Sequence, residues 1–511
     1  MLSMIRSGAV YGIDAHAIEI EVNTGDGEPK IIVVGLPDTA VKESGDRVWT
    51  ALRNSGFATP VGRTTINLAP ANLRKEGPSF DLPIALALLA ASGQLEPKTL
   101  EDTCVVGELA LSGEVRKVRG ILPIALQARD QGLRRMIVPF DNAAEAAVVR
   151  ELEVFPVSNL REAAEFLAGN APIAPKVVDL PALFEEGNRY PFDFSEVKGQ
   201  EYAKRALEVA MAGGHNVLLI GPPGTGKSML AKRMPTIQPA LDLEEALEIT
   251  KVHSIAGLLP SNQPLVSLRP FRAPHHTVSD AGLLGGGAHP MPGEVSLAHR
   301  GVLFLDELPE FDRNVLEVMR QPLEDGQVTI ARAAATVTFP CRFMLVAAMN
   351  PCPCGYLGDP RRECRCGSAL IQRYRSRISG PLLDRIDIHI EVPAMRYEEL
   401  SSLQPGEASA SIRERVSSAR TIQQQRFRGV NGVHCNANMG ARETTRHCTL
   451  AGDAHAMLRH AIGELNFSAR AYDRILKVSR TIADLAGREE ISADDVQEAI
   501  QYRTLDRQLW V

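Results

Sequence analysis

The chain has 511 residues, of which 44% are hydrophobic and 23% are charged, and its formal net charge is −6. This balance is typical of an ordinary globular protein, and the length predicts roughly three domains. A net negative charge excludes a surface that is basic throughout, so any contact with a nucleic acid must come from local basic patches.

The sequence carries no pattern of a secretion signal or a membrane span. Glu19 and Glu21 interrupt the apolar residues near the start, and no apolar run reaches about 18 residues. Eight cysteines in such a chain are expected to be reduced thiols or metal ligands rather than a disulfide framework. We therefore expect a cytoplasmic protein that has no membrane partner.

Residues 1–170 are predicted to form a mixed α/β domain. Residues 15–22 alternate between apolar and polar side chains, which is typical of a half-exposed strand. Apolar runs predict further strands, and Ala- and Leu-rich composition predicts helices. The strands are expected at 31–34, 64–68 and 135–139, and the helices at 82–91 and 121–130.

Two segments of this domain, 75–79 and 107–115, resemble the proteolytic domain of Lon. In that family the serine of the first segment, here Ser79, is the nucleophile, and a downstream lysine activates it. Aligned without gaps, the position of that lysine falls on Ile124, and Lys117 lies seven residues too early. The resemblance therefore implies a Lon-like fold without Lon-like chemistry, and the alternative role for Ser79 is that of a turn residue.

A proline-rich stretch marks a linker over 171–195, and an ATPase core is expected over 196–395. The segment 194–200, followed by a predicted helix at 201–212, resembles the segment before the phosphate loop of AAA+ ATPases. In those proteins backbone and apolar side chains at this place hold adenine. The resemblance implies adenine contacts for Val197 and Gln200, and the alternative is an ordinary helix start.

A phosphate loop follows the apolar strand predicted at 217–220 and precedes a helix predicted at 229–234. Glycines let backbone N–H groups turn towards phosphate oxygens, and the helix N-terminus adds partial positive charge. Lys227 is expected to reach the β- and γ-phosphates and Ser228 to bind Mg²⁺, so the motif predicts ATP and Mg²⁺ as ligands. The match to G-x-x-x-x-G-K-[ST] consists of Gly221, Pro222, Pro223, Gly224, Thr225, Gly226, Lys227 and Ser228.

Two more apolar strands end in polar residues. The first ends in Asp306 and Glu307, which places both carboxylates at the carboxyl edge of a parallel sheet, beside the phosphate loop. We expect Asp306 to hold Mg²⁺ and Glu307 to polarise the attacking water. The second, at 343–349, ends in Asn350. It resembles the first sensor of AAA+ proteins, which implies that Asn350 orients the water or the γ-phosphate.

Two arginines are implied by further resemblance. The segment 380–389 resembles the arginine-finger segment of the magnesium-chelatase and replicative-helicase branch of AAA+, in which Arg385 would enter the nucleotide site of a neighbouring subunit. The alternative is a local salt bridge of Arg385 with Asp384 or Asp387. Within a helical lid expected over 396–511, the segment 466–473 resembles the second sensor, which implies a catalytic role for Arg470; the alternative is a solvated arginine.

Two insertions match those of the same branch. One spans 254–300 and contains His275 and His276, for which packing or capping is favoured over metal binding. The other has alternating runs at 326–330 and 335–339, which predict a β-hairpin. In ring helicases such hairpins contact DNA, so Arg332 at the tip is a candidate phosphate contact, with a solvated arginine as the alternative.

Four cysteines lie in two Cys-x-Cys pairs within an insertion near 351–367. Four thiolates in two close pairs suit tetrahedral Zn²⁺, and the alternative is four separate buried cysteines. The predicted ligands are Cys352, Cys354, Cys364 and Cys366. Cys104, Cys341, Cys435 and Cys448 have no such pairing and are expected to be structural.

The chain around these cysteines is basic, and guanidinium groups bind phosphate in a bidentate manner. We expect DNA to bind there, and the alternative is pairing with acidic neighbours in an oligomer. The first basic group contains the candidate DNA contacts Arg361, Arg362, Arg373 and Arg375, with Arg365 and Arg377. A second group lies on and after a helix predicted at 411–425 and contains Arg413, Arg415, Arg420, Arg426 and Arg428.

The Lon-like domain, the chelatase-type AAA+ core and the Cys-x-Cys pairs together resemble the ComM/YifB family over nearly the whole chain. The resemblance implies a homo-hexameric ring that hydrolyses ATP to drive branch migration of DNA, and thereby promotes recombination of incoming DNA in natural transformation. The expected partner is branched or single-stranded DNA. Two alternatives remain, a magnesium-chelatase-like motor subunit for metal insertion and an ATP-dependent protease.

Overall fold

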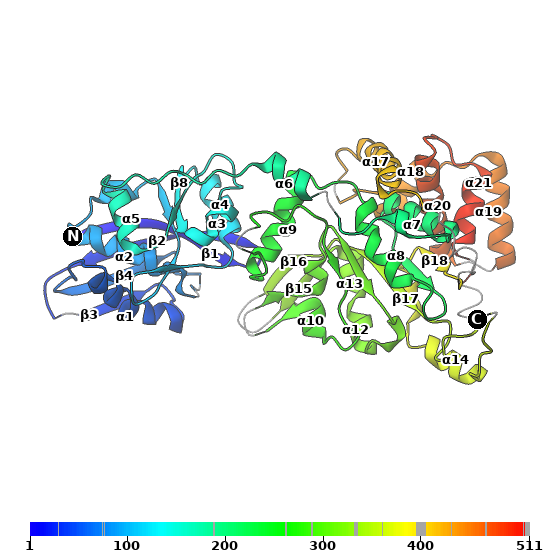
Figure 1. Cartoon of the computed structure of the whole chain (residues 1–511), viewed down its shortest axis with the longest axis horizontal. Coiled ribbons are helices and arrows are strands. Elements are labelled where there is room, and N and C mark those ends of the chain that lie inside the picture. Colours follow the sequence, from blue (N-terminus) through cyan, green and yellow to red (C-terminus); the bar gives the residue numbers. More distant parts are fainter. Residues whose placement is uncertain are drawn as a thin grey trace. The chain divides into compact units, whose positions relative to one another are not determined.

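The computed structural model describes residues 1–28, 30–73, 75, 77–187, 190–260, 263–287, 290–331, 336–359, 361–394, 405–430, 432–465, 468–503 and 505 (Figure 1). The chain divides into two compact units. Unit 1 contains Met1–Glu186, Leu243–Ser267 and Ala331–Phe339, and unit 2 contains Gly187–Asp242, Leu268–Ile330 and Pro340–Val511.

Unit 1 is built on a mixed sheet of seven strands, in the order β3-β4-β2-β1-β5-β8-β9. β1 and β2 pair antiparallel along their whole length, whereas β1, β5, β8 and β9 run parallel. A separate short pair, β6 (Glu108–Leu109) and β7 (Val115–Arg116), is antiparallel. The sheet strands are β1 (Leu2–Tyr11), β2 (Asp14–Thr24), β3 (Lys30–Val34), β4 (Arg63–Ala69), β5 (Thr103–Val105), β8 (Arg135–Pro139) and β9 (Glu153–Val157).

Helices cover this sheet. All eleven residues of α2 are buried, because the helix is apolar on every side and packs on β1 and β2 as well as on neighbouring helices. A Cβ on Gly8 of β1 would lie 2.5 Å from Ile124, so this glycine allows α3 to approach the sheet. The helices are α1 (Thr39–Asn54), α2 (Asp81–Ala91), α3 (Ile121–Asp130), α4 (Ala143–Ala146), α5 (Leu160–Leu167), α6 (Leu180–Gly187) and α9 (Leu243–Ile255).

Helix α9 belongs to unit 1 although it follows the phosphate loop in the sequence. It packs on α3, and the Ser254 hydroxyl donates a hydrogen bond to the Glu145 carboxylate. The Lys117 ammonium donates to the carbonyl of Leu259 at 3.0 Å. Burial raises the pKa of Glu145. The segment after the phosphate-loop helix is therefore part of the packing of the first unit.

Unit 2 contains a parallel sheet of five strands in the order β11-β14-β17-β10-β18. Every residue of β10, β14 and β17 is buried, as expected for apolar runs in a sheet covered on both faces. The strands are β10 (Val217–Ile220), β11 (Phe271–Arg272), β14 (Val302–Leu305), β17 (Met344–Met349) and β18 (Ile388–Glu391). A further strand pair of this unit is β12 (Gly285–Gly286) with β13 (Met291–Pro292). The predicted hairpin forms from β15 (Gln327–Ala331) and β16 (Thr336–Pro340), and its residues are divided between the two units.

The helices of unit 2 fall into a group around the sheet and a C-terminal group, orange to red in Figure 1. The first group is α7 (Glu201–Gly213), α8 (Lys227–Arg233), α10 (Asp280–Leu284), α11 (Glu294–Leu297), α12 (Arg313–Val318), α13 (Arg320–Asp325), α14 (Ser368–Arg375) and α15 (Gly380–Leu383). The second is α17 (Ser409–Arg426), α18 (Ala441–His447), α19 (Gly452–Leu465), α20 (Ala469–Leu485) and α21 (Ala493–Gln501). One hydrophobic core runs through β10, α7, α17 and α20.

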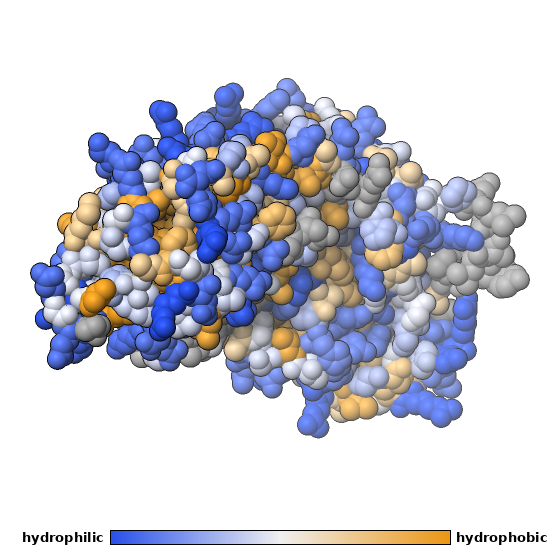
Figure 2. Space-filling view, turned by 60° about the vertical axis from the view of Figure 1, so that its left-hand side comes forward, coloured by the Kyte–Doolittle hydropathy of each residue, from blue (hydrophilic) through white to orange (hydrophobic). Residues whose placement is uncertain are grey.

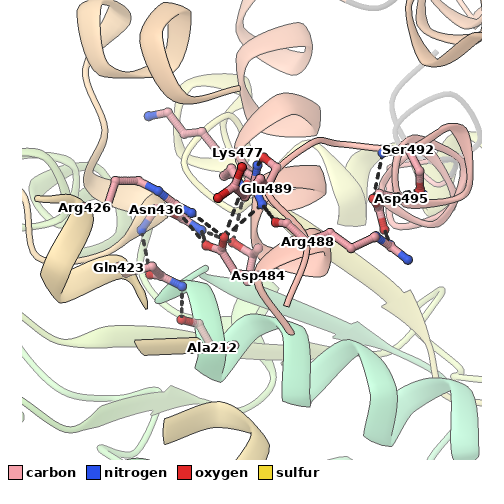
Figure 3. A network of polar contacts seen from close by, with 12 residues as sticks. Ala212, Gln423, Arg426, Asn436, Lys477, Asp484, Arg488, Glu489, Ser492 and Asp495 are labelled. Carbon is pink, nitrogen blue, oxygen red and sulfur yellow. Dashed lines mark hydrogen bonds and ion pairs between the residues drawn. The ribbon is translucent and has the colours of Figure 1, made fainter. Parts of the chain in front are cut away.

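A buried polar network ties the C-terminal helices together (Figure 3). The Asp484 carboxylate is fully buried and accepts hydrogen bonds from Arg426 at 2.7 Å, from Asn436 at 2.7 Å and from Arg480 at 3.1 Å. The Gln423 amide accepts from the Asn436 backbone and donates to a main-chain carbonyl of α7, both at 3.0 Å. The network therefore fixes α17 and α20 on the helix that precedes the phosphate loop.

The structure confirms the predicted fold class, a mixed α/β N-terminal domain followed by an AAA+ α/β core and C-terminal helices. Hydrophilic residues cover most of the face drawn in Figure 2, with apolar residues interspersed among them. Among the residues that the structure describes, no helix combines the length and apolar character needed to cross a bilayer.

Candidate functional site

The phosphate-loop motif lies between β10 and α8, as the sequence predicts. Gly224 and Gly226 have φ of 77° and 87°, which side chains with a Cβ rarely adopt. A Cβ on Gly221 would lie 2.2 Å from the carbonyl oxygen of Val392, after β18. These glycines let the backbone turn sharply at the carboxyl end of β10.

Lys227 lies inside this loop with only 8% of its surface exposed. Its ammonium donates hydrogen bonds to the carbonyl oxygens of Gly221 (2.7 Å) and Pro222 (2.9 Å) and to the Asn350 side-chain oxygen (3.3 Å). Burial lowers the pKa of Lys227, and the charges of Asp306 and Glu307 oppose that shift. The structure therefore provides a buried cation whose hydrogen-bond acceptors are all uncharged.

The carboxyl end of β14 brings two carboxylates, those of Asp306 and Glu307, beside the phosphate loop. The Ser228 hydroxyl donates to Asp306 at 2.6 Å, across 78 residues of sequence. Glu307 has φ of 54°, and its carboxylate lies 3.2 Å from Nδ1 of His276. A hydroxyl beside a carboxylate is a hard oxygen pair of the kind that Mg²⁺ prefers.

The sheet register explains why these groups meet. Ile220 at the end of β10 pairs with Met349 at the end of β17, so Asn350 follows directly beside the phosphate loop. The backbone N–H of Asn350 hydrogen-bonds to the hydroxyl of Tyr374, whose pKa burial raises to about 12. Carboxyl ends of parallel strands share one edge of the sheet, which is what made this convergence predictable.

Gln200 and Val197 lie upstream of the loop. Val197 is fully buried, and the Gln200 side-chain nitrogen donates to the carbonyl of Thr225 at 2.7 Å. The buried Oε1 of Gln200 has no hydrogen-bond partner among the described residues. A buried acceptor without a donor costs free energy, so this oxygen suits a donor group on a ligand.

Arg385 and Arg470 are both engaged within the chain. The Arg385 guanidinium donates to the Pro381 carbonyl at 2.6 Å and forms an ion pair with Glu324. The alternative partners considered from sequence, Asp384 and Asp387, do not pair with it in the described part of the chain. Asp384 instead pairs with the exposed Arg470 at 2.8 Å. The structure thus brings Arg470 to the segment that carries Arg385.

The four cysteines of the Cys-x-Cys pairs come together. The Cys352 sulfur lies 3.4 Å from that of Cys354 and 3.6 Å from that of Cys364, and all four Sγ atoms lie within 4.8 Å of one another. Tetrahedral Zn²⁺ with Zn–S bonds of about 2.3 Å separates its sulfurs by about 3.8 Å. The donor set therefore fits this metal.

The remaining cysteines lie apart from this cluster and are buried. Burial raises the pKa of the thiols of Cys104, Cys341 and Cys448 to about 12. A buried thiol of high pKa is an inert packing group.

The arginines of the first basic group differ in their exposure. Arg361, Arg362 and Arg373 are exposed, and Arg362 donates to the Tyr356 hydroxyl at 2.7 Å. Arg375 is half-buried and donates to the Pro351 carbonyl at 3.1 Å. Its expected role in DNA binding stays a prediction beside this contact. Arg332 lies outside the described residues.

Several arginines of the second basic group form contacts within the chain. Arg415 pairs with Glu208 and Glu407, and Arg420 donates to the Met211 carbonyl at 3.0 Å. Arg426 belongs to the Asp484 network. Dense arginines that suggest an anion site in the sequence thus include several that hold α17 on α7.

In unit 1 the groups that would serve a protease are not arranged as a dyad. Among the described residues, Ser79 and Lys75 form no hydrogen bond with each other. The fully buried Lys75 donates to the Pro70 carbonyl instead. Ile124, at the position of the Lon lysine, is buried against Gly8.

Three contacts of the site went unpredicted. His276 approaches Glu307, Tyr374 accepts from Asn350, and Gly355 touches the phosphate loop. For His276 the sequence offered a signal, because a polar pair soon after a strand next to β14 reaches the same sheet edge. Tyr374 and Gly355 depend on how the cysteine insertion folds back, which local pattern does not reveal.

Three family models match the chain. The model described as magnesium chelatase, subunit ChlI, matches residues 193–400. The model of subunit ChlI of Mg-chelatase matches 20–142, and that of the ChlI C-terminal region matches 406–503.

Curated proteins match over the full length. Competence protein ComM of Haemophilus influenzae is 45% identical over 99% of this chain and 98% of its own length. The uncharacterized protein YifB of Escherichia coli is 44% identical over 99% of this chain and 98% of its own. Magnesium-chelatase subunit ChlI of Cyanophora paradoxa is 21% identical over 62% of this chain and 90% of its own length.

Proposed function

The chain belongs to the ComM/YifB family of AAA+ proteins related to magnesium chelatase, and on that premise we propose that it is an ATP-driven ring motor that acts on DNA. The observation that carries the ATPase part is the phosphate loop 221–228 with Asp306 and Asn350 at the neighbouring strand ends. The DNA part rests on the family and on exposed arginines. We propose domain boundaries at 1–170, 171–195, 196–395 and 396–511.

Within the site, each residue has a proposed role in ATP hydrolysis. Lys227 binds the β- and γ-phosphates, and the triphosphate replaces the carbonyl oxygens that now accept its hydrogen bonds. Ser228 and Asp306 would hold Mg²⁺, which neutralises phosphate charge when bound. Glu307 polarises the attacking water, and Asn350 orients it or the γ-phosphate. Glu307 keeps its carboxylate beside His276 until substrate arrives.

Adenine is proposed to bind beside Val197 and Gln200. The orphaned Oε1 of Gln200 is a suitable acceptor for the exocyclic amino group of the base, and the buried Val197 would pack against the ring. The remaining loop residues, Pro222, Pro223 and Thr225, shape the phosphate cradle.

We propose a homo-hexamer in which Arg385 acts on the nucleotide of the neighbouring subunit, with Arg470 beside it. In the single chain Arg385 pairs with Glu324, so ring assembly must replace that partner by phosphate. Mixing Arg385→Ala chains into wild-type rings tests this role. If Arg385 acts on the neighbouring subunit, turnover should fall by more than the fraction of variant chains in the mixture. A strictly proportional loss would contradict this role.

DNA is proposed to contact Arg361, Arg362 and Arg373, with Arg332 from the hairpin tip. The exposure of Arg361, Arg362 and Arg373 supports contact with phosphates, since guanidinium groups bind them in a bidentate manner. Such binding weakens steeply with salt because counterions are released.

We also propose that the four cysteines bind Zn²⁺. The mutual distances of their sulfurs support this assignment, and bound zinc would cross-link the two halves of the insertion. Metal analysis of the purified protein tests it: about one zinc per chain is expected. Protein without zinc that keeps its fold in chelator would remove the proposal.

The specific process proposed is branch migration during natural transformation, which the name of the Haemophilus influenzae relative, competence protein ComM, supports. One experiment separates this function from its alternatives: the ATPase rate with and without branched or single-stranded DNA, together with casein cleavage. We expect DNA to stimulate the rate and casein to stay intact. A rate indifferent to DNA would favour a chelatase-like motor, and cleavage lost in Ser79→Ala would favour a protease.

A further inference from the structure

The loop that carries the four cysteines begins at the end of β17. Asn350 follows this strand, and Cys352 lies two residues further on, with Pro351 between them. Cys352 is fully buried, whereas the other three cysteines are half-buried. Proline fixes the backbone φ between them, so a displacement of Cys352 is transmitted to the backbone of Asn350.

The same loop lies directly against the phosphate loop. Gly355 has φ of 84°, and a Cβ built on it would lie 2.6 Å from Cδ of Pro223 and 3.9 Å from Cγ of Asn350. Glycine alone satisfies both the backbone conformation and the close contact. The turn after Cys354 is therefore a wall of the candidate nucleotide site.

Helix α14 holds the other side of the insertion. It begins at Ser368, two residues after Cys366. Near its end, Arg375 donates from Nε (3.3 Å) and Nη2 (3.1 Å) to the carbonyl of Pro351, and Tyr374 accepts from the backbone N–H of Asn350. Both ends of the insertion thus meet at the residue that contacts Lys227.

We infer that a thiophilic divalent cation held by the four cysteines positions the phosphate loop and Asn350 for ATP hydrolysis, so that its loss lowers turnover. This inference rests on the zinc site and the ATPase activity proposed above. The cation joins the first cysteine pair, beside Pro223, to the second pair, beside α14. Without it, no cross-link joins the contact of Gly355 with Pro223 to that of Pro351 with Arg375.

The test uses the full chain with Cys364→Ser and Cys366→Ser combined, because these two ligands lie away from the phosphate loop. We expect bound zinc to fall from about one per chain to none and kcat for ATP to fall roughly 10- to 100-fold, with a higher KM. Cys435→Ser is the matched control. Its thiol lies outside the cluster and contacts Asn438 at 2.9 Å, which a serine hydroxyl also reaches, so wild-type zinc and turnover are expected.

The outcomes separate the two proposals. Wild-type protein that contains no zinc would overturn the metal site and this inference with it. Zinc-loaded wild type beside a zinc-free double variant with equal kcat and KM would overturn the inference and leave the metal site intact. Unchanged ATP turnover in zinc-loaded Lys227→Ala would instead contradict the proposed ATPase site.

If the double variant does not fold, Gly355→Ala tests the inference instead. It keeps all four thiols but places a methyl group against Pro223. We expect the zinc content of wild type together with a lower kcat for ATP. Wild-type kcat and KM in this variant would overturn the inference.

Discussion

Two polar clusters of unit 2 differ in how their charges are balanced. Around Asp484, a fully buried carboxylate forms ion pairs with Arg426 and Arg480, so the buried anion is fully paired with cations of the same chain (Figure 3). Around Lys227, the buried ammonium meets only uncharged acceptors, and Asp306 meets a hydroxyl and a backbone N–H. A balanced cluster holds helices together, whereas an unbalanced one is ready for ions of opposite charge from outside.

The largest effect is expected from breaking the balanced cluster. Asp484→Asn leaves the buried Arg480 and the half-buried Arg426 without their anion, which should lower the free energy of unfolding by about 3–5 kcal/mol. Urea unfolding measures it. Glu490→Gln, a change of an exposed residue that lies five positions after Leu485, the last residue of α20, is the control and should stay within about 0.5 kcal/mol. Equal effects of both variants would contradict the structural role of the network.

Next comes the unbalanced cluster. Lys227→Ala removes the cation that would meet the phosphates, so ATP turnover should fall by at least ~10²-fold, or about 2.7 kcal/mol. Stability should fall less than in Asp484→Asn, because the Lys227 ammonium forms no ion pair among the described residues and donates only to uncharged oxygens. Phosphate release and urea unfolding measure the two effects. Lys232→Ala, exposed on the same helix, should behave as wild type, and a Lys227→Ala variant as destabilised as Asp484→Asn would argue against the contrast.

The buried pair of His215 and Asp387 extends the comparison to the pH dependence of the free energy of unfolding. Their side chains lie 2.8 Å apart. Burial lowers the pKa of His215 despite the opposing effect of Asp387. Burial raises the pKa of Asp387, but Arg474 and His215 outweigh this and hold it at about 2.

Both folded-state pKa values lie below those of the unfolded chain, so both groups stabilise the protein at neutral pH. The contribution of His215 is lost as pH falls below about 6.5, with a slope of at most about 1.4 kcal/mol per pH unit. That of Asp387, about 2 kcal/mol, is lost between about pH 4 and 2. Unfolding measured from pH 7.5 to 5.5 should be flatter in His215→Gln; an unchanged pH dependence would exclude His215 as its source.

The smallest effect concerns two exposed arginines near the end of α14. The Arg373 side chain has no hydrogen-bond or ion-pair partner among the described residues, whereas Arg377 pairs with Glu310 at 2.7 Å. Arg373→Ala should reduce the slope of log DNA affinity against log salt by about one, and Arg377→Ala should change it less. Fluorescence anisotropy at several salt concentrations measures both. Identical slopes for all three proteins would remove Arg373 from the DNA surface.

Much of the fold follows from apolar runs. Buried parallel strands leave continuous runs such as β10 and β17, and α3 begins and ends where the pattern predicts. β1 was not predicted, because Ser3, Ser7 and Gly8 break its pattern. The structure explains them: Ser3 donates to the Ala87 carbonyl at 2.7 Å, and Gly8 makes room for α3.

The sequence predicts the parts of the candidate site that lie at the ends of strands. It does not predict the contacts that depend on how helices pack. Lys227 and Asn350 meet because adjacent parallel strands end together. The pairing of Arg385 with Glu324 depends on the packing of α13, which no local pattern encodes. The same holds for Arg415, whose partner Glu208 lies on another helix.

The path of the chain between the two units limits how the protein can be cut into folded fragments. It passes from one unit to the other after residues 186, 242, 267, 330 and 339, so no single cleavage releases an intact N-terminal half. A chain shortened to begin at 187 would keep α9 but lose α3, on which α9 packs. Because the two units share one interlaced chain path, the first unit is not a detachable module that gene fusion or truncation could exchange.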